Sequence, residues 1–225
     1  MINHIWIIMD WNRRWAKARW LLPVMWHHQG AKNLKEIVKI ATKHDINYLT
    51  LWALSVDNLE KRWKDEVTEL IKIINKIETF LWEMLENDVK FQVIWNISKL
   101  PENSQNILND IIEKTKNNKK IVLTLGLVYG WQDEIVRATK KIIKAWIDPE
   151  SLTREEFRKY LDTAILPNPD LIIRTGWDIR HSWFLLFDSE YSEYYFTEKK
   201  WPEFDEAELL KAIESFNNSK RNFGK

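Results

Sequence analysis

The sequence predicts a single-domain α/β protein with a mostly parallel central sheet flanked by helices. Several short apolar runs lack the polar alternation of half-exposed strands, which is typical of strands that are buried on both faces. The segments between these runs repeat apolar residues at the spacing of amphipathic helices. Strands and helices that alternate in this way form βαβ units, whose helices cover both faces of a parallel sheet.

Six segments are candidates for strands. The first run ends at Asp10, directly before a polar and basic segment, as expected where a buried strand emerges at the edge of a sheet. The other runs follow along the chain, and the last of them has the weakest pattern. We therefore expect strands at residues 5–9, 48–55, 89–95, 121–128 and 171–173, with a further one at 183–187.

Apolar residues at helical spacing predict the helices between these strands. The most extended pattern, from Val67 to Met84, predicts one long amphipathic helix. Ser151 or Thr153 is expected to cap a further short helix. The remaining helices are expected around residues 34–41, 107–112, 135–143 and 209–216.

Length, charge and cysteine content limit the classes of function. The chain has 225 residues, enough for one sizeable core, and no linker or repeat divides it, so we expect one domain over residues 1–225. The formal net charge is +1, from 34 basic and 33 acidic residues, so no overall field favours a nucleic-acid partner. The absence of cysteine excludes disulfides and thiolate catalysis. The apolar stretch 4–9 is too short for a signal peptide or membrane span, and we expect a cytoplasmic protein.

The first group of chemically useful residues follows the first predicted strand. In open α/β sheets, ligands bind beyond the carboxyl ends of the strands. Asp10 stands at such an end, where a carboxylate can hold Mg²⁺ together with diphosphate oxygens. Arg14 and the start of the next helix, near Gly30, can hold phosphate oxygens. From these residues alone, a solvated loop with one capping acid is an equally good interpretation.

The second group follows the predicted strand at 171–173. Arg174, Arg180 and Ser182 place two guanidinium groups and a hydroxyl directly after the strand, which indicates a cradle for an oxyanion. An ordinary basic surface loop is the alternative. Two such groups at the carboxyl edge of one sheet favour a shared anion site over either group taken singly.

Five ordered motifs resemble those of the cis-prenyltransferases, of the undecaprenyl diphosphate synthase type. Their order and spacing match the family from about residue 4 to about residue 224. The motifs are His4-Ile5-Trp6-Ile7-Ile8-Met9-Asp10-x-Asn12-x-Arg14-Trp15-Ala16-Lys17; Leu49-Thr50-Leu51-Trp52-Ala53-Leu54-Ser55-x-Asp57-Asn58; Tyr129-Gly130 with Asp133-Glu134-Ile135; Pro169-Asp170-Leu171-Ile172-Ile173-Arg174-Thr175-Gly176 with Arg180, Ser182 and Phe184-Leu185-Leu186; and Tyr191-Ser192-Glu193-x-Tyr195-Phe196-Thr197 with Trp201-Pro202-Glu203-Phe204.

The resemblance implies a role for each matching residue. Asp10 would bind Mg²⁺ and the allylic diphosphate, and Ser55 and Asn58 would assist positioning or proton removal at the reacting ends. Glu193 would support the metal site. The allylic substrate would be bound by Asn12, Arg14, Trp15 and His27, and the diphosphate of isopentenyl diphosphate by Arg174, Arg180 and Ser182.

The resemblance also implies the reaction and the assembly. Such enzymes condense isopentenyl diphosphate onto an allylic diphosphate, such as farnesyl diphosphate, and the product is a membrane-associated lipid, here expected to be a cell-wall lipid carrier precursor. The growing chain would occupy an apolar tunnel between the sheet and the helices near residues 34–41 and 67–84. The family is usually homodimeric, so a second copy of the chain is an expected partner.

The departures from the family pattern are concentrated at glycines. The chain has 14 Trp and only 5 Gly. Tryptophan stands where the family expects glycine at positions 11, 20, 26, 95, 131 and 177, and position 146 is a less strict case. Glycine permits positive φ and close approach of the backbone to phosphate, and tryptophan permits neither readily. Either the sequence has been systematically altered, or it is a divergent natural member whose loops have repacked.

Three functions remain in competition at this point. The first is an active cis-prenyltransferase, favoured by the retained Asp10, Arg174 and Arg180. The second is a non-catalytic member of the same fold, a prenyl-chain binder or partner subunit, favoured by the tryptophan-filled loops. The third is an unrelated α/β phosphate-binding module, which the five ordered motifs disfavour.

Overall fold

The computed structural model describes residues 1–10, 23–55, 64–94, 97–182 and 186–220, with only the backbone described at 23–28 and 64–66. A single six-stranded sheet forms the centre, with the strand order β3-β4-β2-β1-β5-β6 and parallel pairing between all neighbours. The predicted single-domain α/β fold is therefore confirmed. The strands are β1 (His4–Ile8), β2 (Tyr48–Trp52), β3 (Val89–Ile94), β4 (Ile121–Gly126), β5 (Leu171–Arg174) and β6 (Glu193–Phe196).

Strand β1 lies at the middle of the sheet because its side chains suit burial on both faces. Every residue from His4 to Ile8 is buried. The imidazole of His4 lies 2.7 Å from the carbonyl of Pro167 and 2.9 Å from the hydroxyl of Thr50, so a polar ring is accommodated in the core. Burial lowers the pKa of His4 to about 3. The neutral ring therefore links β1 to β2 and to the segment before β5.

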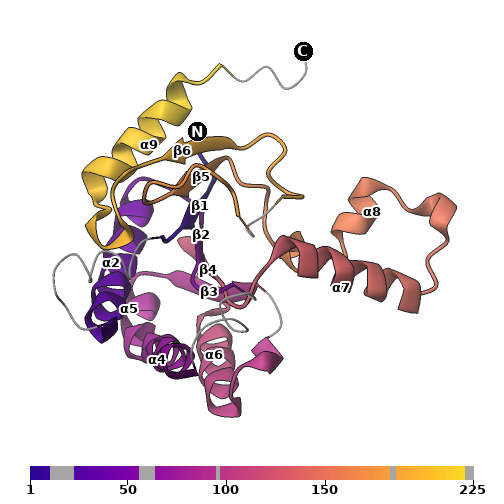
Figure 1. Cartoon of the computed structure of the whole chain (residues 1–225), viewed down its shortest axis with the longest axis horizontal. Coiled ribbons are helices and arrows are strands. Elements are labelled where there is room, and N and C mark those ends of the chain that lie inside the picture. The colour runs from indigo at the N-terminus through magenta and orange to yellow at the C-terminus, as the bar shows by residue number, and fades with distance from the viewer. Residues whose placement is uncertain (11–22, 56–63, 95–96, 183–185, 221–225) are drawn as a thin grey trace.

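The helices surround this sheet, and two of them extend away from it. Figure 1 shows α7 and α8 projecting from the body of the molecule, whereas α2, α4, α5 and α6 gather beside the sheet. Within the described ranges, no helix has the length and apolar character needed to cross a bilayer. The helices are α2 (Pro23–Lys43), α4 (Lys64–Asn75), α5 (Leu81–Glu86), α6 (Glu102–Thr115), α7 (Trp131–Lys144), α8 (Arg154–Arg158) and α9 (Glu206–Asn218), with shorter 3-10 turns between them.

The long helix predicted from Val67 to Met84 is wrong as a continuous element. The 3-10 segment η1 (Lys76–Phe80) interrupts it between α4 and α5. The hydroxyl of Thr79 donates a 2.6 Å hydrogen bond to the carbonyl of Lys76, three residues earlier. Local bonds of this kind compete with the α-helical pattern, and β-branched residues such as Ile77 and Thr79 weaken it further.

The sixth strand is also not where we expected it. Of the predicted strand 183–187, residues 183–185 lie outside the described part of the chain, and 186–187 lie in a bend and turn. The edge strand is instead β6, which pairs with β5 from Glu193 opposite Leu171 to Phe196 opposite Arg174. Its aromatic residues suit a partly exposed edge strand.

Thr153, one of the two expected caps, accepts a 3.1 Å hydrogen bond from the N–H of Glu156 at the start of α8.

Helix α7 ends in a left-handed turn that is occupied by tryptophan. Trp146 has a φ of 53°, and its side chain is 93% exposed. The N–H of Trp146 donates to the carbonyl of Ile143 at 3.2 Å, and the N–H of Ile147 donates to Ile142 at 3.4 Å. These two bonds form a Schellman motif, whose left-handed position glycine normally occupies. The left-handed conformation costs a non-glycine residue about 1–2 kcal/mol.

We therefore expect Trp146→Gly to stabilise the protein by about 1 kcal/mol, because glycine adopts this conformation without steric cost and little apolar burial is lost. Chemical denaturation monitored by circular dichroism measures this change. Trp82→Gly is the control. Trp82 is also largely exposed, but it lies in the first turn of α5 and does not have a positive φ. That variant should lose stability, and a loss in both variants would contradict the explanation.

Candidate functional site

The parallel register brings Asp10 and Arg174 together at the carboxyl edge of the sheet. Ile8 lies opposite Arg174 in the pairing of β1 with β5. The guanidinium of Arg174 donates from Nε to Oδ2 of Asp10 at 3.0 Å and from Nη2 to the same oxygen at 2.5 Å. Arg174 is 4% exposed, whereas the Asp10 side chain is 33% exposed. The pair thus consists of a buried cation and a carboxylate that still faces outward.

The backbone of Asp10 is held from two sides. Its N–H donates to the hydroxyl of Thr175 at 2.9 Å, and its carbonyl accepts from the N–H of Trp201 at 3.2 Å. Thr175 is fully buried and also donates its own N–H to Ile8. Neither anchoring residue was identified from the sequence, although both lie in quoted motifs. Both residues hold the backbone of Asp10 only because segments that are distant in the sequence meet at this edge of the sheet, and no local sequence pattern predicts that meeting.

The second predicted group forms one cluster around Arg174. The Nη1 group of Arg174 donates to the hydroxyl of Ser182 at 2.7 Å and to the carbonyl of Arg180. The guanidinium of Arg180 lies 2.9 Å from Asp178, and that carboxylate is 3.8 Å from Arg174. The predicted proximity of Arg174, Arg180 and Ser182 is therefore found. Two guanidinium groups in one loop can bind the oxygens of a diphosphate in a bidentate manner.

The loop that holds this cluster contains one of the unusual tryptophans. Gly176 has a φ of 89°, which only glycine adopts readily. Trp177 follows it and is 59% exposed. Its indole is therefore not part of the core and lies on the surface of the loop that carries Arg174 and Arg180. Trp11, which follows Asp10 in the sequence, lies outside the described residues.

Ser55 reaches the same edge through an isolated bridge between the segments that follow β2 and β4. It pairs with Tyr129 in a parallel bridge and is 4% exposed. The N–H of Tyr129 donates to the carbonyl of Leu54 at 3.1 Å. The preceding residue, Val128, is fully buried and has a φ of 53°, an unfavourable conformation for a β-branched side chain. Strained backbone of this kind occurs preferentially at functional sites.

A buried acid lies behind Ser55 and Tyr129. The hydroxyl of Tyr129 donates to Oε2 of Glu134 at 2.5 Å, and the N–H of Thr163 donates to Oε1 at 3.0 Å. Burial raises the pKa of Glu134 and raises that of Tyr129 well above its usual value. The acid therefore fixes Tyr129, and hence the bridge to Ser55, from the interior side.

Glu193 is not brought to this cluster within one chain. It is the first residue of β6 and lies opposite Leu171, whereas Arg174 ends β5. Because Leu171 and Arg174 are three residues apart in β5, Glu193 lies about 10 Å from Arg174 along the strand direction. Its role at the metal site stays a prediction.

The predicted residues Asn12, Arg14, Trp15 and Asn58 lie outside the described residues, as does the side chain of His27.

Asp10 offers one carboxylate for a divalent cation. No cluster of three or more His, Cys, Asp or Glu side chains that could hold a metal occurs among the described residues. Both contacts from Arg174 go to Oδ2 of Asp10. Magnesium is commonly held by one or two carboxylates together with substrate phosphates and water. The partly exposed Asp10 carboxylate fits that arrangement, and one carboxylate does not fit a site made of protein ligands alone.

Two separate cavities lie where an apolar tunnel was expected. The smaller one, about 120 Å³, is lined by Met9, Gly30 and Trp201 near the site, and by Leu34 and Phe80 farther away. The larger one, about 370 Å³, is also lined by Leu34 and Phe80 and continues between α2 and α5 to the amino ends of β3 and β4. The cavities therefore follow α2 from one edge of the sheet to the other. A continuous tunnel stays a prediction.

Comparisons with known proteins agree with this arrangement. A family model described as "Putative undecaprenyl diphosphate synthase" matches residues 8–224. The isoprenyl transferase of Fusobacterium nucleatum is 43% identical over 223 residues, which cover 99% of this chain and 95% of that protein. The isoprenyl transferase of Clostridium perfringens is 41% identical over 229 residues, which cover 100% of this chain and 90% of that protein.

Two solved structures have the same fold along the whole chain. The crystal structure of lavandulyl diphosphate synthase from Lavandula x intermedia, in complex with dimethylallyl diphosphate, has a TM-score of 0.95 and 34% identity, and covers 100% of this chain and 98% of that one. A probable undecaprenyl diphosphate synthase from Campylobacter jejuni has a TM-score of 0.83 and 29% identity, and covers 100% of this chain and 99% of that one. The chain belongs to the undecaprenyl diphosphate synthase family and is a cis-prenyltransferase enzyme.

Proposed function

We propose that this enzyme performs the Mg²⁺-dependent condensation of isopentenyl diphosphate onto an allylic diphosphate, such as farnesyl diphosphate. The main supporting observation is the Asp10–Arg174 pair, which joins the Arg180 loop on one side and lies next to Met9 at an apolar cavity on the other. The reaction needs two adjacent diphosphate sites and a cavity for hydrocarbon, because the acceptor alkene must meet the allylic carbon at near-attack distance.

The residues have distinct tasks in this proposal. Asp10 would hold Mg²⁺, which supplies positive charge to the departing diphosphate when it is bound. Arg174 fixes the Asp10 carboxylate and, with Arg180 and Ser182, binds the diphosphate of isopentenyl diphosphate. Ser55 lies at the same edge and, with Asn58, is proposed to position the reacting ends or assist removal of the proton.

The cavities suit the hydrocarbon part of the substrate. The smaller cavity begins at Met9, directly before Asp10, and is lined mainly by apolar side chains of α2 and α4. Each methylene that leaves water for such a lining contributes about 0.8 kcal/mol to binding. We propose that the allylic chain enters here and grows toward the larger cavity.

A long cis-polyprenyl diphosphate is the proposed product, made in the cytoplasm as a precursor of a cell-wall lipid carrier and delivered to a membrane. The alternative of a non-catalytic binder or partner subunit is not favoured, since the similar curated proteins are named as isoprenyl transferases. The retained Asp10, Arg174 and Arg180 also favour catalysis.

A homodimer is the proposed assembly. Strand β6 is an edge strand. Tyr194 in this strand is 38% exposed, and Tyr191 just before it is 56% exposed. The projecting helix α7 exposes Val136 and Ile143, which are seven residues apart and thus on one face. Exposed apolar surface of this kind often marks an interface. Light scattering at micromolar concentration should give twice the monomer mass, and a monomer alone would contradict the assembly.

Replacement of Asp10 tests the metal site. We expect Asp10→Ala and Asp10→Asn to lower Mg²⁺-dependent turnover by roughly a hundredfold or more, because the departing diphosphate loses its metal-bound stabilisation. Incorporation of radiolabelled isopentenyl diphosphate with farnesyl diphosphate measures this turnover.

Asp110→Ala, which removes an exposed acid on α6, is the control and should keep full turnover. Because Arg174 is buried, unfolding curves of both Asp10 variants must show that they remain folded. Folded variants with unchanged turnover would contradict the role.

The tryptophans in the two phosphate loops provide a further test. We expect the double variant Trp11→Gly with Trp177→Gly to bind both diphosphates about tenfold to a hundredfold more tightly and to turn over faster, because each loop regains room for a charge-assisted hydrogen bond to phosphate. Calorimetric titration with farnesyl and isopentenyl diphosphates measures the affinities. Trp146→Gly should leave them unchanged, because Trp146 lies at the end of α7. Unchanged affinity in the double variant would mean that the indoles do not obstruct the site.

A further inference from the structure

A short 3-10 turn makes hydrogen bonds both to Asp10 and to helix α2. The turn η5 (Trp201–Glu203) follows β6, and the N–H of Trp201 donates to the carbonyl of Asp10 at 3.2 Å. The indole N–H of the same residue donates to the carbonyl of Gly30 in α2 at 3.0 Å. One buried residue thus contacts, through its backbone, the residue that is proposed to bind the metal and, through its side chain, the helix that lines the cavity.

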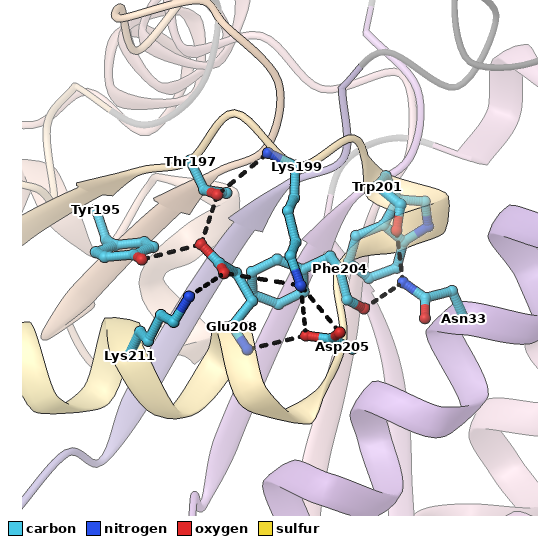
Figure 2. A network of polar contacts seen from close by, with 9 residues as sticks. All are labelled: Asn33, Tyr195, Thr197, Lys199, Trp201, Phe204, Asp205, Glu208 and Lys211. Carbon is cyan, nitrogen blue, oxygen red and sulfur yellow. Dashed lines mark hydrogen bonds and ion pairs between the residues drawn. The ribbon is translucent and has the colours of Figure 1, made fainter.

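Asn33 fixes this turn against α2. Its amide Nδ2 donates to the carbonyl of Trp201 at 2.6 Å and to the carbonyl of Phe204 at 3.0 Å (Figure 2). The rings of Trp201 and Phe204 stack with their centroids 6.1 Å apart. With the indole bond to Gly30, three hydrogen bonds join η5 to a single turn of α2.

The other side of η5 is held by a network of charged groups. Asp205 caps α9 by accepting from the N–H of Glu208 at 3.0 Å, and Lys199 lies 2.9 Å from the Asp205 carboxylate. Glu208 accepts from the hydroxyls of Thr197 at 2.6 Å and Tyr195 at 3.0 Å. Figure 2 shows this network on one side of the turn and Asn33 on the other. The turn is therefore fixed to β6 and α9. Among the described residues, Asn33 and Trp201 hydrogen-bond the turn to α2 beside the cavity, whereas α9 contacts the far end of α2, where Lys43 lies 2.9 Å from Glu206.

The two diphosphate sites depend on η5 to different extents. The loop of Arg174 is held by β6 and the segment after it, since Thr197 donates to the carbonyl of Arg174 at 3.0 Å and Gly176 donates to Lys199 at 2.7 Å. Neither bond involves α2. The allylic substrate, by contrast, must contact Asp10 with its diphosphate and the α2 wall with its chain. Its binding therefore requires the correct distance between Asp10 and α2.

We propose that Asn33 and Trp201 are positioning residues that set this distance for the allylic substrate. The proposal rests on the function proposed above. The diphosphate end would be placed by the backbone of Asp10, and the chain by the cavity wall at Gly30, which Trp201 also lines. Loosening η5 from α2 should weaken allylic binding and leave binding of isopentenyl diphosphate intact.

Asn33→Ala tests the proposal with a closely matched control. Asn118 also donates from Nδ2 to two carbonyls, those of Met84 and Val89, but it does so near the amino edge of the sheet, opposite Asp10. We expect Asn33→Ala to raise the KM and Kd for farnesyl diphosphate about tenfold, the effect of about one lost hydrogen bond, with the KM for isopentenyl diphosphate changed less than twofold. Asn118→Ala should change neither constant, although both variants lose comparable stability.

Two conservative variants separate positioning from general damage. Asn33→Ser replaces the amide donor with one hydroxyl donor and should recover part of the allylic affinity that Asn33→Ala loses. Trp201→Phe keeps an aromatic ring beside Phe204 but removes the indole N–H that bonds to Gly30, so it should shift the constants in the same direction as Asn33→Ala. Equal changes for both substrates, or equal changes in the Asn33 and Asn118 variants, would overturn the proposal.

Calorimetry distinguishes this proposal from the proposed function. If the parent protein binds farnesyl diphosphate but does not incorporate isopentenyl diphosphate, the condensation reaction is wrong, and the Kd of Asn33→Ala still decides the positioning role. If the parent turns over and Asn33→Ala binds farnesyl diphosphate as tightly as the parent, the positioning role is wrong and the reaction stands. A parent that neither binds nor turns over would overturn both.

Discussion

The structure at the carboxyl edge of the sheet depends on a buried guanidinium. Arg174 is 4% exposed, and a charge at that depth is tolerated only when it is paired and hydrogen-bonded. Asp10 supplies the carboxylate, and Ser182 and the carbonyl of Arg180 supply the remaining acceptors. Satisfying one buried cation thus brings together the end of β1 and the loop after β5. The same requirement explains why the two proposed diphosphate sites are adjacent.

The parallel sheet makes this pairing possible without any special sequence between the two segments. Asp10 and Arg174 are separated by 164 residues, yet β1 and β5 are neighbours with Ile8 opposite Arg174. All six strands are parallel and end at one edge, so loops that follow different strands can contribute to a single site. Helix α2 then connects this edge to the cavities, and the 3-10 turn η5 fixes its distance from Asp10.

The tryptophans differ in their structural consequences. Trp6 and Trp201 are buried in the core, and Trp201 also makes specific hydrogen bonds. Trp146 and Trp177 are exposed, one in a left-handed helix terminus and the other in the arginine loop. Trp146 itself has a φ of 53°, and Trp177 directly follows Gly176, which has a φ of 89°. Their effects should therefore be conformational at Trp146 and steric at Trp177.

The sequence by itself determined the α/β class, the position of five strands and the residue types at the carboxyl edge, because burial on both faces and helical periodicity are local properties. The tertiary structure decided what local pattern does not contain. The 3-10 segment η1, in which Thr79 bonds back to Lys76, interrupts the predicted long helix, and the edge strand forms at Glu193–Phe196, where it pairs with β5. The distance of Glu193 from Arg174 follows from strand register. The link from Asp10 through Trp201 to Asn33 requires three distant segments to meet, and only the folded chain brings them into contact.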